Sequence, residues 1–359
     1  MKKVIPKSAI VILPIIFITL LIRAVCVKNG DIAEWVVVNI GYPLRHSLAT
    51  VTSRVSFSIA EAIILLSPII VAFIIIIASR KNGKGQRLRF LISILLIASM
   101  LYTVYFLVLG VGYRRKSVSS LMELDVSNSV NSDSVYKTLL ILKEECESLV
   151  DEIDFSENGE SIMPYDFNTL NEKLLDAYEK IDEKYPLLGI KNFDSMAKEV
   201  KCSPAMTAVD ILGIYTFFTG EANINVHYPD YNIPFTVAHE LAHQRGIARE
   251  DEANFLAFAV TVSSDDSYIK YSGYLNAFEY MASALAQSEK EAVSAVYSDL
   301  DERIYDELVA MSRFYHENDF PLFSKISSFL NDRYLKANGT EGIVSYSSVV
   351  RFLVAYYEN

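Results

Sequence analysis

Three uncharged apolar runs near the start of the chain constrain its fold more than any other feature. The first lies between Lys7 and Arg23 and continues beyond that arginine to Val27, and the others occupy residues 62–79 and 90–113. Each run approaches or reaches the roughly 20 residues that a helix needs to cross a bilayer. We therefore predict three membrane-spanning helices, at residues 8–27, 58–79 and 90–112.

Basic residues beside these runs predict how the chain is oriented in the membrane. Lys2 and Lys3 precede the first run as in a secretory signal peptide, but no small-x-small cleavage site follows, so we interpret the run as a retained anchor. Further basic residues crowd the short loop before the third run, which places both groups in the cytoplasm. Three spans then put everything after Tyr113 outside, although residues 114–116 oppose this orientation. The prediction is a multi-pass cell-membrane protein with an extracytoplasmic C-terminal domain.

Charge divides the chain at the same place. Residues 1–116 contain 15 Lys and Arg and 3 Asp and Glu, whereas residues 117–359 contain 18 and 41. The acidic downstream part argues against nucleic acid as a partner, because phosphate binding needs a basic face. We therefore predict a transmembrane region over residues 1–116 and a separate extracytoplasmic domain over residues 117–359.

The pattern of the downstream part is mainly helical. Apolar residues recur at steps of three and four in residues 135–153 and 170–181, as on one face of a helix. Residues 222–228 instead alternate apolar and polar side chains, which predicts a half-buried strand. Helices resume near Pro234, and those near 300–317, 320–335 and 345–357 most simply complete a helical core. The predicted fold class is mainly α with a small β edge.

A His-Glu-x-x-His motif at residues 239–243 carries the clearest chemical signal. Residues four apart lie on one face of a helix, so His239 and His243 can direct ring nitrogens at one metal ion. Glu240 lies beside that pair and can hold the water that the metal activates. Because the chain has only 5 histidines in 359 residues, this motif is not expected to arise by chance. It predicts a Zn²⁺ site.

Zinc in a catalytic site needs a third protein ligand and keeps a fourth position for water. A metzincin pattern would place that ligand at position 249, but Arg249 cannot bind zinc. Gly246 can adopt a positive φ and end the first helix, so that a second helix starting near Ala248 packs back across it.

On that second helix, Glu250 shares a face with two alanines that allow a close approach, Ala253 and Ala257. We therefore predict Glu250 as the third zinc ligand, and leave Glu252 as the alternative. Asn254 lies one turn after Glu250 and is predicted to orient a histidine ring by hydrogen bonding.

The motif and its surroundings resemble known zinc peptidases. The His-Glu-x-x-His segment followed by Glu250-x-x-Ala253-Asn254 looks like the gluzincin pattern of thermolysin-like peptidases, in which a downstream helix supplies the third ligand. More specifically, the chain resembles the bacterial domain-of-unknown-function family 3810, regarded as membrane-anchored zinc peptidases. This resemblance implies a helical, gluzincin-like peptidase domain on a membrane anchor, and it implies no physiological substrate. The stretches that carry it are residues 112–115, 218–223, 235–257, 271–274 and 342–346.

Hydrolysis of a peptide bond is the reaction that these residues predict. Glu240 would take a proton from the activated water and pass it to the leaving amine. The developing oxyanion then needs a donor, for which Tyr271, Tyr274 and His316 are candidates, although any tyrosine is more often a packing residue.

The polar side of the predicted strand suggests where a substrate binds. Asn223, Asn225 and His227 occupy alternate positions there, and an extended peptide could add alongside them as a further strand. A sheet edge without any ligand is the alternative interpretation.

Together these patterns predict a membrane-anchored zinc-dependent peptidase that acts on a peptide or protein substrate. Its other predicted partner is the lipid bilayer, and its oligomeric state is left open. The alternative is a non-catalytic membrane receptor or scaffold that retains a zinc-peptidase fold, but the intact Glu240 favours the enzyme. Intramembrane proteolysis is disfavoured, because charged residues such as Arg245 and Asp251 surround the motif.

Overall fold

The computed structural model describes residues 5–81, 83–126, 130–190, 195–342 and 348–358. Lys2 and Lys3, on which the predicted orientation partly rests, and residues 343–346, which belong to the family resemblance, lie outside these ranges. The described chain is mainly helical, with one three-stranded sheet. It divides into two compact units, Met1–Lys116 with Thr216–Glu221, and Ser117–Tyr215 with Ala222–Asn359.

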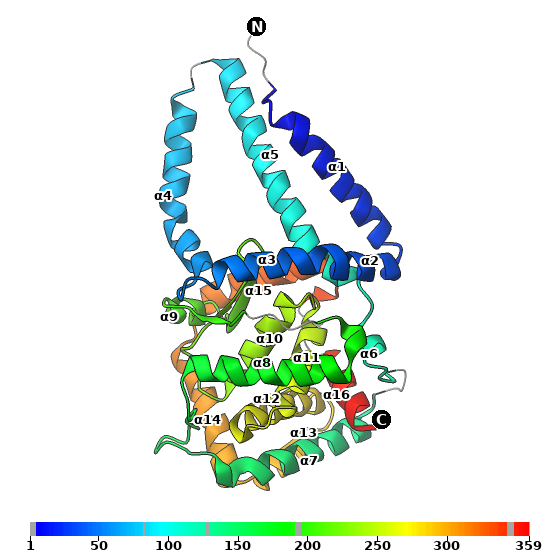
Figure 1. Ribbon diagram of the computed structural model, residues 1–359. Helices are drawn as coiled ribbons and strands as arrows, with labels where there is room; N and C mark the ends of the chain where they lie inside the picture. Colours follow the sequence, from blue (N-terminus) through cyan, green and yellow to red (C-terminus); the bar gives the residue numbers. More distant parts are fainter. Residues whose placement is uncertain (1–4, 82, 127–129, 191–194, 343–347, 359) are drawn as a thin grey trace. The chain divides into compact units, whose positions relative to one another are not determined.

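The first unit contains three helices that are long and apolar enough to span a membrane: α1 (Ala9–Cys26), α4 (Ile59–Ser79) and α5 (Lys84–Val108). The first two match the predicted spans closely. The third begins six residues before its predicted start at residue 90 and ends at Val108 rather than at residue 112. The chain tightens there into a 3₁₀ turn, η2 (Gly110–Arg114). Figure 1 shows all three helices.

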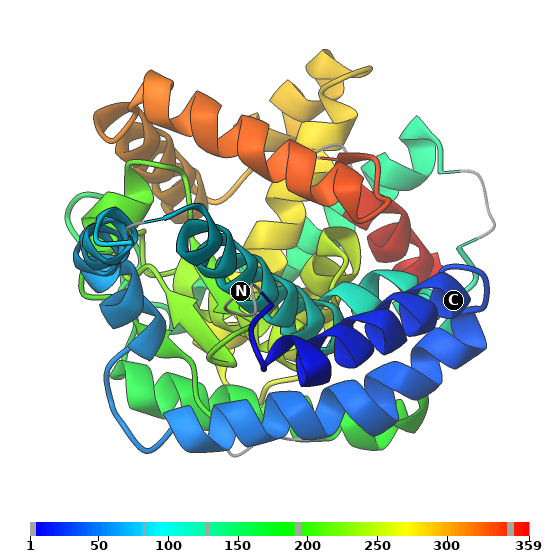
Figure 2. The same cartoon turned by 90° about the horizontal axis from the view of Figure 1, so that it is seen from above.

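Between α1 and α4, a nearly continuous helical run lies crosswise to them (Figure 1). Figure 2 shows this run along one side of the unit. Within this run, Arg45 is 1% exposed and donates hydrogen bonds to the carbonyl oxygens of Val108 and Val37, both at 3.1 Å. Arg45 thereby satisfies a carbonyl in the last turn of α5, which has no partner within its own helix. The run comprises α2 (Gly30–Val36), the π-helical η1 (Val37–Gly41) and α3 (Tyr42–Thr52).

The short segment Thr216–Glu221 belongs to the first unit although it is distant in sequence. Glu221 accepts hydrogen bonds from the backbone nitrogens of Ile59 at 3.0 Å and Ala60 at 2.8 Å. A carboxylate at these two nitrogens caps the N-terminus of α4 and complements its helix dipole. This contact gives the Glu221 carboxylate a structural role that its sequence position did not suggest.

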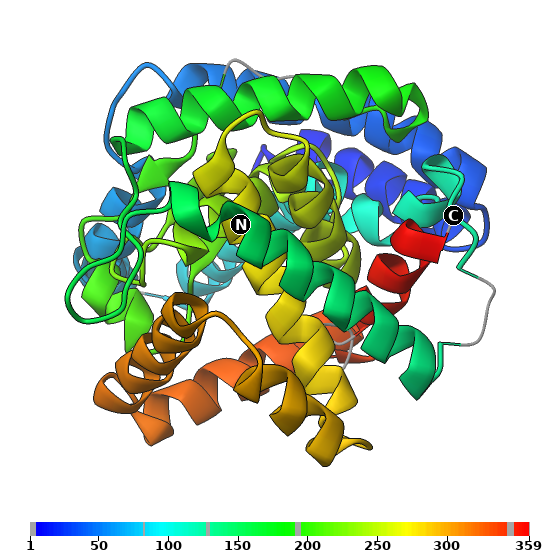
Figure 3. The same ribbon diagram turned by 90° about the horizontal axis from the view of Figure 1, so that it is seen from below.

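The second unit is built around α10, α11, α12 and α7, whose facing sides form its apolar core. Figure 3 shows α7 running across α12. The described helices of this unit are α6 (Val118–Leu121), α7 (Ser132–Leu149), η3 (Val150–Glu152), α8 (Phe167–Lys184), η4 (Pro186–Leu188), α9 (Ser203–Thr207), α10 (Asn232–Gln244), α11 (Glu250–Val262), α12 (Ser267–Leu285), α13 (Lys290–Ser298), α14 (Glu302–Glu317), α15 (Pro321–Ala337) and α16 (Val349–Glu358).

The sheet contains β1 (Lys198–Glu199), β2 (Gly213–Thr216) and β3 (Glu221–Ile224), in the order β1-β3-β2. β1 and β3 run parallel, with Lys198 opposite Asn223. The predicted strand at 222–228 therefore exists, but it ends at Ile224, and it is the central strand. Asn223 does not lie on a free edge, because both sides of β3 pair with neighbouring strands, and Asn225 follows the end of the strand. That a peptide binds along these two asparagines stays a prediction.

The helices near the C-terminus do not all behave as predicted. α16 buries Phe352 and Leu353 in the core, as expected. α15 occupies the predicted segment, but only Leu335 of its 17 residues is buried. The prediction that this helix completes the core is wrong, because its apolar side faces away from the rest of the unit.

Candidate metal centre

The centre is formed by two helices joined by a tight turn. α10 ends at Gln244, and Gly246 has a φ of 94°, a conformation that glycine adopts without strain. The backbone nitrogen of Ile247 then donates to the carbonyl oxygen of Ala242 at 3.1 Å, which closes the turn. α11 begins at Glu250, two residues later than the predicted start near Ala248.

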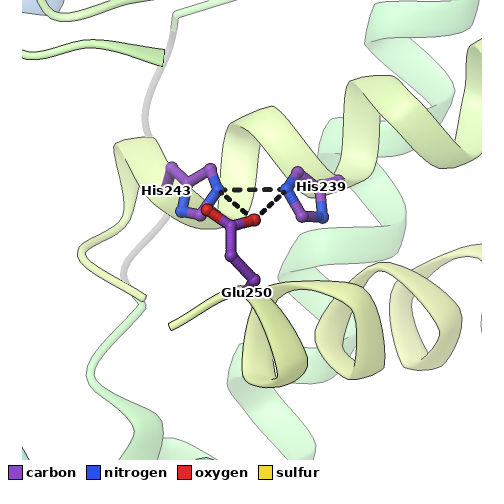
Figure 4. A group of neighbouring side chains, drawn as sticks. All are labelled: His239, His243 and Glu250. Carbon is purple, nitrogen blue, oxygen red and sulfur yellow. Dashed lines mark hydrogen bonds and ion pairs between the residues drawn. The ribbon is translucent and has the colours of Figure 1, made fainter. Parts of the chain in front are cut away.

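The turn brings Glu250 from the first position of α11 to the two histidines of α10. The Nε2 atoms of His239 and His243 are 3.0 Å apart, and Glu250 Oε2 lies 3.3 Å from the former and 3.6 Å from the latter. Figure 4 shows all three side chains converging on one point. These three residues, called the His-His-Glu cluster below, could hold a metal ion.

The spacing within the His-His-Glu cluster fits a tetrahedral ion. Ligand atoms about 2.1 Å from a tetrahedral Zn²⁺ lie about 3.4 Å from one another. The three separations of 3.0, 3.3 and 3.6 Å bracket that value. Two imidazoles and one carboxylate are also a donor set that zinc accepts, with a fourth position left for water.

A backbone contact fixes the orientation of one ring. His243 Nδ1 lies 2.7 Å from the carbonyl oxygen of Ile247. Since a carbonyl only accepts, Nδ1 carries the proton, and in the neutral ring the lone pair is then on Nε2, which faces the His-His-Glu cluster. The same turn that ends α10 therefore also selects the tautomer that a metal ligand needs.

The His-His-Glu cluster is electrostatically coupled as well as close. Burial alone would raise the pKa of Glu250, but His243 and His239 outweigh it and hold that pKa well below its usual range. Burial alone would lower the pKa of His243, but Glu250 outweighs it and raises the pKa to about 9. A metal cation bound by the His-His-Glu cluster would replace the protonated His243 ring as the positive charge that stabilises the Glu250 carboxylate.

Glu240 lies beside the His-His-Glu cluster with one oxygen unused. Its side chain is 5% exposed, and its Oε2 is buried without a hydrogen-bond partner in the described part of the chain. Burial raises its pKa, while the two histidines and a hydrogen bond from the Tyr215 backbone lower it. Burying a carboxylate oxygen without a hydrogen-bond donor costs folding free energy unless a water or a substrate group donates to it. A carboxylate that accepts a proton from water beside a metal ion would have such a donor.

The neighbouring acidic residues have different partners. Asp251 is 2% exposed, and its Oδ2 lies 3.1 Å from Nη2 of both Arg249 and Arg351. Glu252, the alternative third ligand, accepts a hydrogen bond from the Val118 backbone at 3.2 Å. The structure therefore brings Glu250 to the histidines and engages Glu252 with the start of α6.

The three asparagines that the sequence suggested as supporting or substrate-binding residues have different surroundings. Asn254 is buried, and its Nδ2 has no hydrogen-bond partner among the described residues, so its proposed contact with a histidine ring stays a prediction. Asn223 Nδ2 donates to the Ile214 carbonyl at 3.2 Å. Asn225 Nδ2 donates to Thr207 Oγ1 and to the Ile211 carbonyl, both at 2.9 Å. Both asparagines thus stabilise the sheet region.

The predicted oxyanion donors are placed in other surroundings. The Tyr271 hydroxyl donates to Glu307 Oε2 at 2.6 Å inside the core. Tyr274 is half-buried and packs edge-on against Phe258. His316 lies on the exposed side of α14. These contacts give the two tyrosines packing and hydrogen-bonding roles, and a role for either one as an oxyanion donor stays a prediction.

A different tyrosine, Tyr280, lies on α12, which packs against the histidine-bearing α10. Burial raises the pKa of Tyr280, and the carboxylates of Glu279 and Glu250 raise it further. Its ring lies 6.2 Å from that of Phe235 in the first turn of α10. Nothing in the sequence distinguishes Tyr280 among the 22 tyrosines. Only the packing of α12 against α10 brings it to this place.

Comparison with known proteins yields a family and no annotated relative. The model of a family described as "Protein of unknown function (DUF3810)" matches residues 40–354. No curated protein and no solved structure matches the chain.

Proposed function

Because the chain belongs to the DUF3810 family, whose function is unknown, we propose an activity from the site itself: zinc-dependent hydrolysis of peptide bonds by a membrane-anchored enzyme. The observation that carries the proposal is a possible metal position at the His-His-Glu cluster beside a buried, unpartnered oxygen of Glu240. A structural zinc site would be closed by four protein ligands, whereas three ligands beside a carboxylate suit a hydrolytic centre.

In the proposed arrangement, His239, His243 and Glu250 hold the ion. A bound Zn²⁺ would supply Lewis acidity, which makes a water more acidic and polarises the substrate carbonyl. The Ile247 carbonyl keeps the His243 ring in its binding tautomer. Neutral imidazoles and an ionised carboxylate are the required ligand states, and the low pKa of Glu250 already favours its ionised form.

Glu240 acts as the proposed general base and then as general acid. Its Oε2 takes the proton of the attacking water and later delivers it to the leaving amine. The Tyr215 backbone hydrogen bond keeps the other side of the carboxylate in place. Burial raises the Glu240 pKa, which strengthens the carboxylate as a base.

Tyr280 is the residue that we propose as the hydrogen-bond donor to the oxyanion. Tyr280 lies on α12, which packs against the histidine-bearing α10, and its hydroxyl is protonated near neutral pH, so that it can donate a hydrogen bond. The substrate is proposed to be an extracytoplasmic peptide or protein, because the basic loop before α5 favours a cytoplasmic position for that loop.

The test uses the full-length protein purified in detergent with zinc. We expect about one zinc per chain in the wild type and in Glu240→Gln, and loss of zinc in His239→Ala and Glu250→Ala. Cleavage of unstructured peptides should be lost in all three variants, whereas His316→Ala, which alters an exposed histidine, should retain both properties. A folded wild type without zinc would contradict the proposal. Zinc retention without cleavage of any peptide in a broad library would favour the scaffold instead.

A further inference from the structure

The helix α15 presents an unusual surface, with large apolar side chains on its outer face. Leu322 is 68% exposed, Phe329 is 59% exposed and Leu330 is 61% exposed. Soluble domains rarely leave so many large apolar residues together in water. The complete set in and just before this helix is Phe320, Leu322, Phe323, Ile326, Phe329, Leu330 and Tyr334.

These residues form one stripe, because they recur at steps of three and four along the helix. The opposite side of α15 contains Ser324, Asn331 and Leu335, of which only Leu335 is fully buried. α15 therefore directs its more polar side toward its own unit and its apolar side outward, the reverse of an ordinary surface helix. Figure 3 shows α15 at the periphery of that unit.

The charges of α15 differ from those of the surrounding domain. The helix carries Lys325, Arg333 and Lys336 against the single acid Asp332, whereas residues 117–359 as a whole contain 18 basic and 41 acidic residues. Arg333 lies over the Phe329 ring at 5.3 Å, so its long side chain runs along the apolar stripe. Basic side chains beside an apolar stripe complement anionic lipid headgroups.

The chain itself keeps this unit close to a bilayer. α5 is the last of three helices long and apolar enough to span a membrane, and it ends at Val108. The second unit begins at Ser117. Even when fully extended, the intervening residues reach only about 30 Å. If these helices span a membrane, a lipid surface is always available to the apolar stripe.

We propose that α15 is an interfacial membrane helix, with its apolar stripe inserted below the headgroups of the bilayer and its lysines at the phosphate level. The helix would hold the second unit to the membrane directly, in addition to the chain connections at residues 109–116 and at Thr216–Glu221. This proposal is independent of zinc binding and of peptidase activity.

The experiment uses the full-length protein in lipid nanodiscs, with the exposed Cys202 changed to Ser. An environment-sensitive fluorophore is attached to Phe329→Cys in the stripe or to Ser328→Cys, an exposed position on another face of the helix. The nanodiscs contain nitroxide-labelled lipids, and iodide serves as the aqueous quencher. We expect lipid quenching to be about threefold stronger at position 329, and stronger again when anionic lipid is added.

Every other outcome contradicts the proposal. Equal lipid quenching at both positions would show that the fluorophore itself enters the bilayer, whichever face of α15 carries it. Iodide quenching at both positions would show that the stripe faces water. Shielding of position 329 from both quenchers would show that protein covers it, either a second copy, another part of the chain or a partner.

A second variant tests the same stripe without a probe inside it. Ile326→Glu is combined with the fluorophore at Leu322→Cys, and its matched control is Ser328→Glu. Both changed side chains are exposed, so neither should lower the melting temperature. We expect Ile326→Glu alone to reduce lipid quenching several-fold. Unchanged quenching in this variant would overturn the proposal.

Discussion

A Cβ atom added to Gly213 would lie 2.7 Å from Oε1 of Glu240, so the backbone of β2 rests directly against the side chain of the proposed catalytic base. The neighbouring Tyr215 backbone also hydrogen-bonds to Glu240. β2 therefore confines this carboxylate from one side, while the His-His-Glu cluster lies on another. The position of Glu240 depends on a strand that precedes α10 in the sequence.

Gly213→Ala should impair catalysis without removing zinc. The new methyl group must displace the Glu240 side chain, and overpacking of this kind costs about 1–3 kcal/mol. We expect peptide cleavage to fall by about tenfold or more, because a misplaced general base loses most of its effect. Zinc content measured by mass spectrometry should be unchanged. Gly85→Ala is the matched control, because a Cβ atom there meets nothing within 4 Å. Full activity in Gly213→Ala would contradict the confinement of Glu240 by β2.

Tyr280→Phe should lower kcat with little change in KM or zinc content. The phenylalanine keeps the packing against Phe235 but removes the hydroxyl, and loss of one oxyanion donor costs about 100- to 1000-fold in kcat. Tyr274→Phe is the matched control on the same helix and should leave kcat within about twofold. If instead Tyr274→Phe is the variant that loses kcat, the original sequence-based candidate was the better one.

Asp251→Asn should weaken zinc binding although Asp251 is not a ligand. Asp251 holds Arg249 and Arg351 at the first turn of α11, next to Glu250. A partner that hydrogen-bonds a ligand directly is worth about 10- to 100-fold in metal affinity, and because Asp251 acts only through the start of α11 we expect a loss of about tenfold or less. Competition with a chromophoric chelator measures this affinity. Asp265→Asn removes an exposed ion pair with Lys180 and should have no effect. Equal affinity in Asp251→Asn and the wild type would exclude this role.

Removal of zinc should lower the melting temperature of the protein. An ion that binds only the folded state stabilises it by about 2.7 kcal/mol when its concentration is one hundred times its Kd. We expect a chelator to lower the wild-type melting temperature and added zinc to restore it. In His239→Ala neither treatment should have an effect. A chelator effect of equal size in that variant would place the stabilising metal elsewhere.

The buried Glu307 should make stability depend on pH. Burial raises its pKa from 4.5 to about 7, although hydrogen bonds from Ser161 and Tyr271 oppose the increase. The folded state therefore binds more protons than the unfolded state between these two values. The contribution of Glu307 to stability falls as pH rises from about 4.5 to about 7, by up to about 3 kcal/mol.

Thermal unfolding at pH 5 and pH 8 tests this dependence. Glu307→Gln removes the titrating group and should reduce the difference in melting temperature between the two pH values. Glu302→Gln, an exposed carboxylate on the same helix, should leave it unchanged. An identical pH dependence in Glu307→Gln and the wild type would show that other groups produce it.

The sequence by itself determined the features that are local in the chain. Uncharged apolar runs specify helices of membrane-spanning length, since every residue of the run contributes to the same property. The His-Glu-x-x-His motif placed His239 and His243 on one helix face because their spacing matches one turn. Gly246 marked the end of that helix, because its positive φ is a property of glycine. From that turn, the sequence favoured Glu250 as the residue brought back to the histidines but left Glu252 as the alternative, and only the structure separates the two.

Only the tertiary structure decided what depends on neighbours distant in the chain. Period-two alternation predicts a strand but does not say whether its edges are free, so the central place of β3 could not be predicted. The spacing of apolar residues in α15 predicts a helix but not the direction of its apolar face. Tyr280 and Gly213 approach the site through helix packing and sheet pairing, which join segments far apart in sequence. Such contacts are set by the whole fold, whereas a motif records only its own spacing.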